Sequence, residues 1–327
     1  MMRVPAISRP FITGITLSVG LAATATFVAK TLGGPALLYA LLLGMCFKLL
    51  GDKVKSGVTF SGRTILRIGV ALLGFRIAVS DLLALGIAPA LLIIAAVTLT
   101  ILFGAAFARA LGLKPALGIL TGGATAICGA SAAMAIGTLL PRDKIDERDI
   151  TFAVVAVTTL STLSMVLYPP VIHALGLGDM DAGFIIGATI HDVAQVVGAG
   201  YMVSPAAGDH ATVTKLFRIA LLVPVTTVLA AMFASGRNGA KGPTSTIPWF
   251  LILFVVFAGI RSTGIVPDKL VSLANDASRW CLCIAIAAVG LKTSVGDMRS
   301  LGFKALLLAI AETLFLITVV VLGMLYD

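Results

Sequence analysis

The stretch Gly187-Ala-Thr-Ile-His-Asp-Val-Ala-Gln-Val-Val-Gly-Ala-Gly200 places an imidazole, a carboxylate and a carboxamide inside an apolar run that extends over 182–203. Titratable groups at membrane depth cost a few kcal/mol and usually mark a substrate, ion or proton path. If the backbone breaks at 187–190, Asp192 is a natural N-cap for the half-helix that follows. If the run is instead one helix, residues four apart share a small and polar face, namely Gly183, Gly187, His191, Gln195 and Ala199. Both interpretations predict a functional site here.

The composition is that of a polytopic membrane protein. Of the 327 residues, 59% are hydrophobic and only 12% are charged, and the mean hydropathy is +1.08. The apolar runs are continuous rather than alternating, which argues against a β-barrel. The net charge of +9 is explained by basic loops that set topology, and no Lys/Arg run is dense enough for a nucleic-acid partner. We therefore expect an all-α protein that has the lipid bilayer as its surroundings.

Several stretches are long enough to cross a hydrocarbon layer of about 30 Å. The basic residues fall mostly in alternate loops, which predicts a cytoplasmic N-terminus. The first apolar run is long for a signal peptide and has no convincing cleavage site after it, so it is expected to be a transmembrane helix. About 10–11 transmembrane helices are predicted, at 11–29, 35–50, 64–80, 87–108, 115–139, 150–172, 182–203, 213–234, 247–262, 270–291 and 303–326.

An internal repeat relates residues 63–101 to residues 279–317. The strongest block aligns Gly74-Phe-Arg-Ile-Ala-Val-Ser-Asp81 with Gly290-Leu-Lys-Thr-Ser-Val-Gly-Asp297, and Arg63 aligns with Arg279. In the predicted topology the two copies run in opposite directions through the membrane. Inverted repeats of this kind are typical of secondary transporters that alternate access. The sequence thus predicts one transmembrane transporter domain over 1–327.

A second unusual stretch is Thr121-Gly-Gly-Ala-Thr-Ala-Ile-Cys-Gly-Ala-Ser-Ala-Ala-Met-Ala-Ile-Gly137. Its small residues are also what a tightly packed helix interface requires. A break near 127–129 would leave the amides of a new half-helix free to bind an anion. Together with the first stretch, it supplies the candidate substrate-binding residues Thr125, Cys128, Gly129, Ala130, Ser131, Thr189, His191 and Gln195.

The candidate ion-coupling residues are His191 and Asp192, because such a pair can take up a proton in the physiological range. The structural alternative is an imidazole bonded to a neighbouring helix and an Asp192 paired with a basic residue. Arg76 and Lys292 occupy equivalent repeat positions, and one of them could counter a bound anion or Asp192. Glu312 is alone in an apolar run, where it is a candidate buried partner.

Taken together, the two glycine-rich stretches resemble the YeiH-type family of proposed sulfate exporters, as does Gly69-Val-Ala-Leu-Leu-Gly-Phe-Arg76. That family is similar in plan to the cation:proton antiporter and bile-acid symporter group of inverted-repeat carriers. The resemblance covers essentially the whole chain. It implies a multi-pass carrier of the bacterial inner membrane that moves sulfate, sulfite or small sulfonates.

These features favour a secondary active transporter of a small inorganic or organic anion, coupled to protons or sodium and alternating its access. A rival is a cation/proton antiporter in which Asp192 binds the ion, and a second rival is a passive channel. An intramembrane enzyme is disfavoured because no G-x-S-x-G or H-E-x-x-H motif occurs. No cofactor or metal is expected, since the four cysteines form no C-x-x-C pair and no zinc-like cluster. The sequence leaves a homo-oligomer open.

Overall fold

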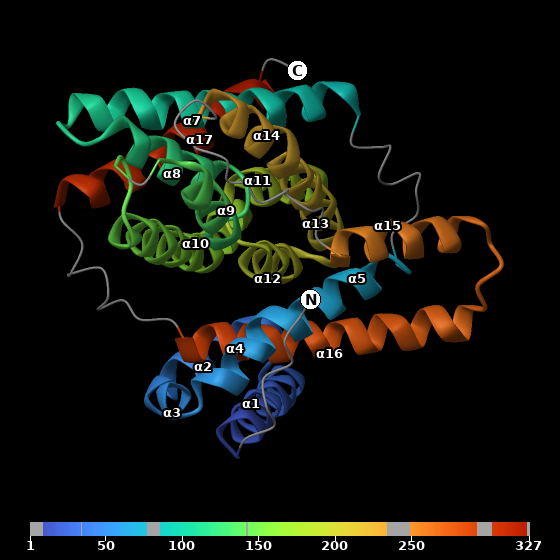
Figure 1. Cartoon of the computed structure of the whole chain (residues 1–327). Coiled ribbons are helices and arrows are strands. Elements are labelled where there is room, and N and C mark those ends of the chain that lie inside the picture. Colours follow the sequence, from blue (N-terminus) through green and yellow to red (C-terminus); the bar gives the residue numbers. More distant parts are fainter. Residues whose placement is uncertain are drawn as a thin grey trace. The chain divides into compact units, whose positions relative to one another are not determined.

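The computed structural model describes residues 9–33, 35–76, 86–141, 143–233, 249–292 and 303–325, and every regular element among them is a helix (Figure 1). The chain forms two compact units. The first comprises residues 1–84 and 248–294, and the second comprises 85–247 and 295–327. Each unit is therefore built from two separate stretches of the chain.

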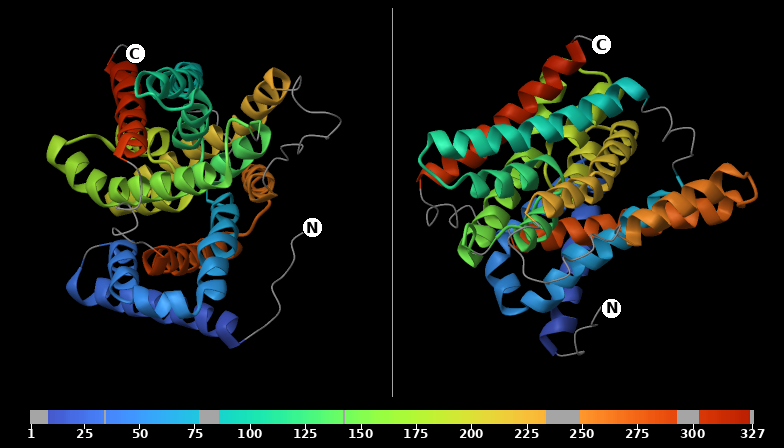
Figure 2. Two further views of the ribbon diagram at one scale, coloured as in Figure 1. Left: turned by 60° about the vertical axis from the view of Figure 1, so that its left-hand side comes forward. Right: turned by 45° about the horizontal axis from the view of Figure 1, so that its top comes forward.

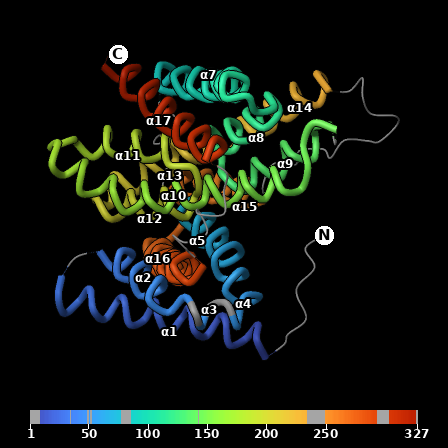
Figure 3. Tube along the Cα trace, turned by 90° about the vertical axis from the view of Figure 1, so that its left-hand side faces the viewer, coloured from blue at the N-terminus to red at the C-terminus, as the bar shows by residue number. Residues whose placement is uncertain are grey.

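The longest helix of the first unit is α16 (Asp268–Lys292). It packs against α1, α2 and α5. Figure 3 shows α16 end-on with these three helices around it. The close approach of α2 and α16 depends on Gly44 and Gly290, because a Cβ atom on either would collide with the backbone of the other helix. The other helices of the unit are α1 (Arg9–Leu32), α2 (Ala36–Cys46), α3 (Lys48–Lys53), α4 (Lys55–Phe60), the π-helix η1 (Ser61–Ile65), α5 (Leu66–Leu73) and α15 (Trp249–Ser262).

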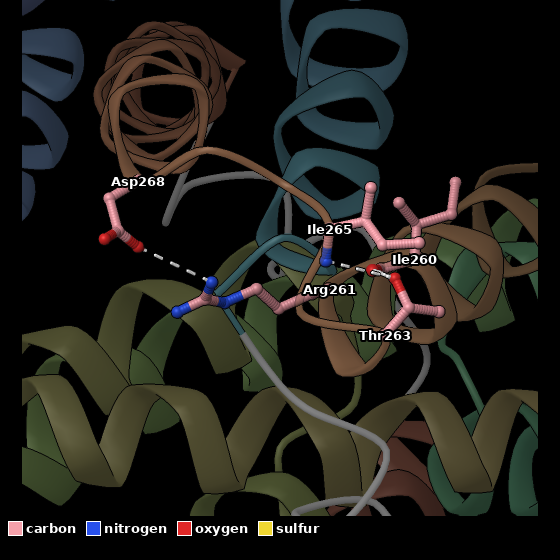
Figure 4. A network of polar contacts seen from close by, with 5 residues as sticks. All are labelled: Ile260, Arg261, Thr263, Ile265 and Asp268. Carbon is pink, nitrogen blue, oxygen red and sulfur yellow. Dashed lines mark hydrogen bonds and ion pairs between the residues drawn. The ribbon is translucent and has the colours of Figure 1, made fainter.

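The turn between α15 and α16 is held by local polar contacts (Figure 4). Arg261 Nη1 lies 3.7 Å from Asp268 Oδ1, and the Ile265 amide donates to Thr263 Oγ1 at 3.4 Å. The Thr263 hydroxyl in turn donates to the Ile260 carbonyl at 2.7 Å. Because the side chain of Asp268 is almost fully exposed, its ion pair contributes little to stability.

The second unit contains both glycine-rich stretches. The long helices α7 and α17 run beside each other, and α8 packs against α7 (Figure 2). Helix α13 packs against both α11 and α12. The helices of the unit are α7 (Ile87–Ala110), α8 (Pro115–Ala126), α9 (Ala130–Leu139), α10 (Glu147–Leu175), α11 (Asp179–Thr189), α12 (Val193–Val203), α13 (Pro205–Ala220), α14 (Leu222–Met232) and α17 (Phe303–Leu325).

The charged loop before α10 is a solvated helix start. The side chain of Asp146 accepts hydrogen bonds from the amides of Arg148 and Asp149, and Asp149 bonds back to the Asp146 amide. This reciprocal capping box satisfies the first amides of α10. This loop thus fixes where a long membrane helix begins.

The predicted all-α polytopic architecture is confirmed. Within the described ranges, six helices are long and apolar enough to cross a membrane: Arg9–Leu32, Ile87–Ala110, Glu147–Leu175, Pro205–Met232, Asp268–Lys292 and Phe303–Leu325. Each overlaps a span predicted from the apolar runs. The predicted spans 115–139 and 182–203 are each divided into two shorter helices.

The repeat of 63–101 and 279–317 stays a prediction. Its first halves contribute to α5 and α16, which pack together, and its second halves contribute to α7 and α17, which also pack together. Its best-matched block includes 77–81 and 293–297, which lie outside the described residues. The orientation of the two copies, the cytoplasmic N-terminus and the single transporter domain are likewise untested.

Candidate functional site

The first helix break separates α8 from α9. Helix α8 ends at Ala126, and Ile127 leaves helical geometry with φ −111° and ψ −83°. Gly129 then adopts φ +62° and ψ −126°, a conformation that L side chains rarely adopt, before α9 begins at Ala130. The predicted break at 127–129 is confirmed, and the glycine at its end is what allows it.

The second break separates α11 from α12. Helix α11 ends at Thr189, and the backbone is extended at Ile190 (ψ 140°) and Asp192 (ψ 148°). The Asp192 side chain accepts the Ala194 amide at 3.1 Å, so Asp192 is the N-cap of α12 as the broken-helix alternative predicts. The single-helix alternative is wrong, because extended backbone at Ile190 and Asp192 interrupts the shared face on which it depends.

The two breaks lie directly against each other. A Cβ atom on Gly129 would lie 3.6 Å from the His191 carbonyl oxygen and 3.7 Å from the Asp192 Cβ. The Nδ1 atom of His191 lies 3.0 Å from the Thr125 carbonyl oxygen. Two motifs more than 60 residues apart in sequence therefore form one site. We call residues 127–129 and 190–192 the paired breaks.

Lys215 on α13 closes the paired breaks from one side. Its side chain is only 1% exposed. Its Nζ donates to the carbonyl oxygens of Ile127 at 2.7 Å, Ile190 at 2.9 Å and His191 at 2.5 Å. An ammonium group has three hydrogens, so these three carbonyls satisfy it completely.

Arg218, one turn further along α13, binds the ends of α8 and α11. Arg218 is also only 1% exposed. The carbonyls at a helix C-terminus lack intrahelical partners and carry the negative end of the helix dipole, so a buried cation is stabilised there. The N···O distances are 2.9 Å to Thr125, 2.6 and 2.8 Å to Ala126, 2.9 Å to Gly187 and 3.0 Å to Ile190.

Glycines of α11 set the position of α13. A Cβ atom on Gly183 would lie 2.8 Å from the Ala207 carbonyl oxygen, and one on Gly187 would lie 2.5 Å from the Ala211 carbonyl oxygen. Only glycine allows the two backbones to come this close. The small residues of the sequence motif thus bring Lys215 to the paired breaks.

Lys215 and Arg218 are not among the site residues predicted from the sequence motifs. The signal was present, because both lie inside the predicted span 213–234 and their spacing of three residues puts them on one helix face. Two basic residues on one face of an apolar span are a functional-site hypothesis by the same rule that selected His191.

His191 is buried with 0% exposure, and both of its ring nitrogens have partners. A carbonyl only accepts, so Nδ1 carries the hydrogen that it donates to Thr125. Nε2 lies 3.1 Å from the Thr313 hydroxyl on α17. The ring is therefore bonded to neighbouring helices and not to Asp192, whose amide donates to Ser161 on α10 at 3.0 Å. The coupling role of His191 and Asp192 stays a prediction.

The N-terminal side of the paired breaks has a different character. No side chain caps α9, and its first residues are accessible, with Ala130 half-buried and Ser131 exposed. Asp192 and Val193, at the start of α12, are also half-buried. Two half-helices thus present their positive N-terminal ends at partly accessible positions, an arrangement suited to an anion.

Two polar side chains near the paired breaks keep unused hydrogen-bonding capacity. Gln195 on α12 donates from Nε2 to Thr162 at 3.3 Å, but its Oε1 is buried without a partner in the described structure. The Thr125 hydroxyl is also buried without a partner there. The Thr189 hydroxyl, by contrast, donates to the Ile185 carbonyl at 2.6 Å, and Cys128 is buried at the break.

The predicted charge partners belong to the first unit. Arg76 follows α5, and Lys292 is the last residue of α16. Both make contacts within the chain. Their pairing with a bound anion or with Asp192 stays a prediction. Within the described ranges, no three His, Cys, Asp or Glu side chains gather in a way that could hold a metal ion.

Comparison with known proteins gives a family for the chain. The family model described as "Conserved hypothetical protein 698" matches residues 13–309. Relatives include the UPF0324 membrane protein CT0845 of Chlorobaculum tepidum, which is 46% identical over 95% of this chain and 88% of its own length. The chain belongs to the UPF0324 family of membrane proteins.

Other members show the spread of the family. The UPF0324 membrane protein TauZ of Paracoccus pantotrophus is 46% identical over 95% of this chain and 94% of its own length. The UPF0324 inner membrane protein YeiH of Escherichia coli is 32% identical over 94% of this chain and 91% of its own length. The predicted resemblance to the YeiH-type family is therefore confirmed, and so is the assignment as a membrane protein.

Proposed function

We propose that this protein is a secondary active transporter of a small anion of the sulfate, sulfite or small-sulfonate class. It resides in the bacterial inner membrane, where its relative YeiH is named as a protein of that membrane. Access to the site alternates between the two sides, and transport is coupled to protons or sodium. The substrate binds at the N-termini of α9 and α12, beside the paired breaks.

The observation that carries this proposal is the asymmetry of charge across the paired breaks. The negative C-terminal ends of α8 and α11 are saturated by Lys215 and Arg218. The positive N-terminal ends of α9 and α12 are countered only by the Asp192 cap in the described structure. The local excess of positive charge therefore favours an anion.

The alternative is a cation/proton antiporter, and one observation favours it. Asp192 is a half-buried carboxylate in irregular backbone, the surroundings in which transporters coordinate ions. Against it, a cation at Asp192 would share the site with the positive ends of two half-helices. It would also compete with the Ala194 amide for Oδ1.

A ligand screen by thermal stability in detergent separates the two functions. A ligand that binds the folded protein stabilises it by about 2.7 kcal/mol at a concentration 100-fold above its Kd. We expect the melting temperature (Tm) to rise selectively with sulfate, sulfite or methanesulfonate. This rise should be lost in Ser131→Ala, which removes an exposed hydroxyl at the start of α9, and kept in Ser56→Ala, which removes an exposed hydroxyl in the first unit. A response to sodium or pH alone, with every anion silent, would favour the antiporter.

A further inference from the structure

Glu312 lies in the middle of α17 and is fully buried, with 0% exposure. It is one of only two glutamates in the chain, the other being the exposed Glu147 at the start of α10. Its Oε1 lies 2.7 Å from the Thr121 hydroxyl, and its Oε2 has no hydrogen-bond partner among the described residues. No basic residue pairs with it in that part of the chain.

The helices around Glu312 leave room for its carboxyl group. A Cβ atom on Gly104 of α7 would collide with Oε1, and one on Gly122 of α8 would lie 3.5 Å from it. Thr100, one turn before Gly104, adds a buried hydroxyl that has no partner in the described structure. The carboxyl therefore occupies a space made by two glycines, and Thr100 keeps a spare hydroxyl on the Gly104 face of α7.

The hydrogen bonds around Glu312 fit a carboxyl group that carries a proton. The Thr121 hydroxyl lies 2.9 Å from the Leu117 carbonyl oxygen and 2.7 Å from Glu312 Oε1. A hydroxyl has one hydrogen to donate, so both contacts form fully only if Glu312 donates its own proton to Thr121. A buried carboxylate without a cation would also cost several kcal/mol, whereas the neutral acid avoids most of that cost.

Among the described residues, no charged group from the neighbouring helices is paired with Glu312. Helix α17 packs against α7, α8, α10 and α11, and α8 has no charged residue. The interior titratable groups of this region are His191, reached through Thr313, and Tyr168 of α10. The remaining ones lie in the first or last turns of their helices: Arg109, Glu147, Arg148, Asp149, His173, Asp179 and Asp181.

Two short chains of contacts join Glu312 to the paired breaks. Thr313, the next residue, binds the ring of His191. Thr121 lies one turn before Thr125, whose carbonyl oxygen is held by both His191 and Arg218. A change in the charge of Glu312 therefore acts, through these contacts, on the residues that shape the anion site.

The charged groups of this core are Lys215, Arg218, Asp192 and Glu312. It has four loading states, set by whether Glu312 carries a proton and whether an anion is bound. The formal charges balance in two of these four states. With Glu312 ionised and no anion bound, Lys215 and Arg218 offset the carboxylates of Asp192 and Glu312. With a proton on Glu312 and a monovalent anion at the half-helices, the same two cations offset Asp192 and the anion. A proton alone leaves one positive charge in excess, and an anion alone leaves one negative charge. Since net charge is costly within hydrocarbon, the two neutral states are the ones suited to change access.

We propose that Glu312 is the proton-binding site of this carrier and that one proton bound there travels with one monovalent anion. The step is a protonation of the Glu312 carboxylate on one side of the membrane and its reversal on the other, with no other bond made or broken. The proposal rests on the transport function proposed above and assigns coupling to a residue outside the paired breaks.

Infrared spectroscopy tests proton binding without any transport. The C=O stretch of a protonated carboxyl should be present at neutral pH in wild type and in the matched control Glu147→Gln, and it should be missing in Glu312→Gln. Addition of methanesulfonate, the monovalent probe, should keep this band present up to a higher pH. Identical spectra for wild type and Glu312→Gln would overturn the proposal. If no anion stabilises the protein, the transport function fails, while the spectra still decide whether Glu312 holds a proton.

Uptake into proteoliposomes then tests coupling, with the same anion as probe. A pH gradient, acid outside, should drive accumulation in wild type and in Glu147→Gln. Glu312→Gln, which copies the neutral acid, should keep anion exchange but lose accumulation. Wild-type accumulation in Glu312→Gln, or loss of exchange from the folded variant, would contradict the proposal. If Glu312→Gln does not fold, Glu312→Asp replaces it and should accumulate the anion with a shifted pH midpoint; an unshifted midpoint would refute the assignment.

Discussion

Replacement of Lys215 by methionine is the sharpest test of how the paired breaks are held. Methionine has a similar length and is apolar, so Lys215→Met removes the ammonium and keeps most of the packing. The carbonyl oxygens of Ile127, Ile190 and His191 all lose their donor. The side chain is 1% exposed, so water does not readily replace that donor.

The cost follows from those three contacts. Each buried carbonyl that loses its partner costs roughly 1 kcal/mol or more, and removal of the buried ammonium returns part of that cost because its desolvation penalty disappears. We expect a net destabilisation of about 2–4 kcal/mol. At about 2–4 °C per kcal/mol for a unit of this size, the Tm should fall by roughly 5–15 °C.

The assay is the thermal unfolding of purified protein in detergent, with and without the stabilising anion. Lys304→Met is the matched control, because Lys304 is an exposed residue in the same unit. It should leave the Tm within about 1 °C of wild type, as surface substitutions usually do. A Lys215→Met protein as stable as wild type, with its anion response intact, would refute the view that this cation holds the paired breaks.

Three further outcomes test other parts of the site. Asp192→Asn should keep the cap of α12, because asparagine caps as well as aspartate. It should lose proton-driven accumulation in proteoliposomes, because the state with both proton and anion bound then carries a net charge; wild-type accumulation would exclude a role of the Asp192 charge in coupling. Gly129→Ala should lower stability by about 1–2 kcal/mol because its φ is +62°, whereas Gly178→Ala, at φ −65°, should not, as denaturation curves can show. The amide of Asp149 holds the pKa of the exposed Asp146 carboxyl below its usual range, so its stabilisation is present at neutral pH and is lost as the pH falls through that depressed pKa. The Tm of Asp146→Asn should therefore fall less on acidification than that of wild type.

Much of the fold follows from the sequence because membrane burial simplifies the rules. Long apolar runs must form helices, since lipid offers no partner for backbone groups. The breaks could also be predicted, because glycine at 129 and a capping residue at 192 are local signals. The six long helices among the described residues overlap predicted apolar runs for this reason.

The partners of the site are harder to read, because they depend on which helices pack together. Nothing local to Thr313 indicates that its hydroxyl meets a histidine 122 residues away. Glu312 stood out as a buried charge, but its Thr121 partner lies 191 residues away on α8. The sequence marks which polar residues are buried, and only the packing shows which of them meet.

Glycines and buried cations together explain why the charge at the proposed site is positive. Glycines at 183 and 187 bring α13 against α11, and this contact carries Lys215 and Arg218 to the carbonyl ends of two helices. Once those ends are neutralised, the amide ends of α9 and α12 are the uncompensated half of each broken helix. A site made in this way selects the sign of the ligand's charge through the backbone, so Gly129→Ala and Lys215→Met should also weaken the anion-dependent rise in Tm, even though both variants leave the Ser131 hydroxyl in place.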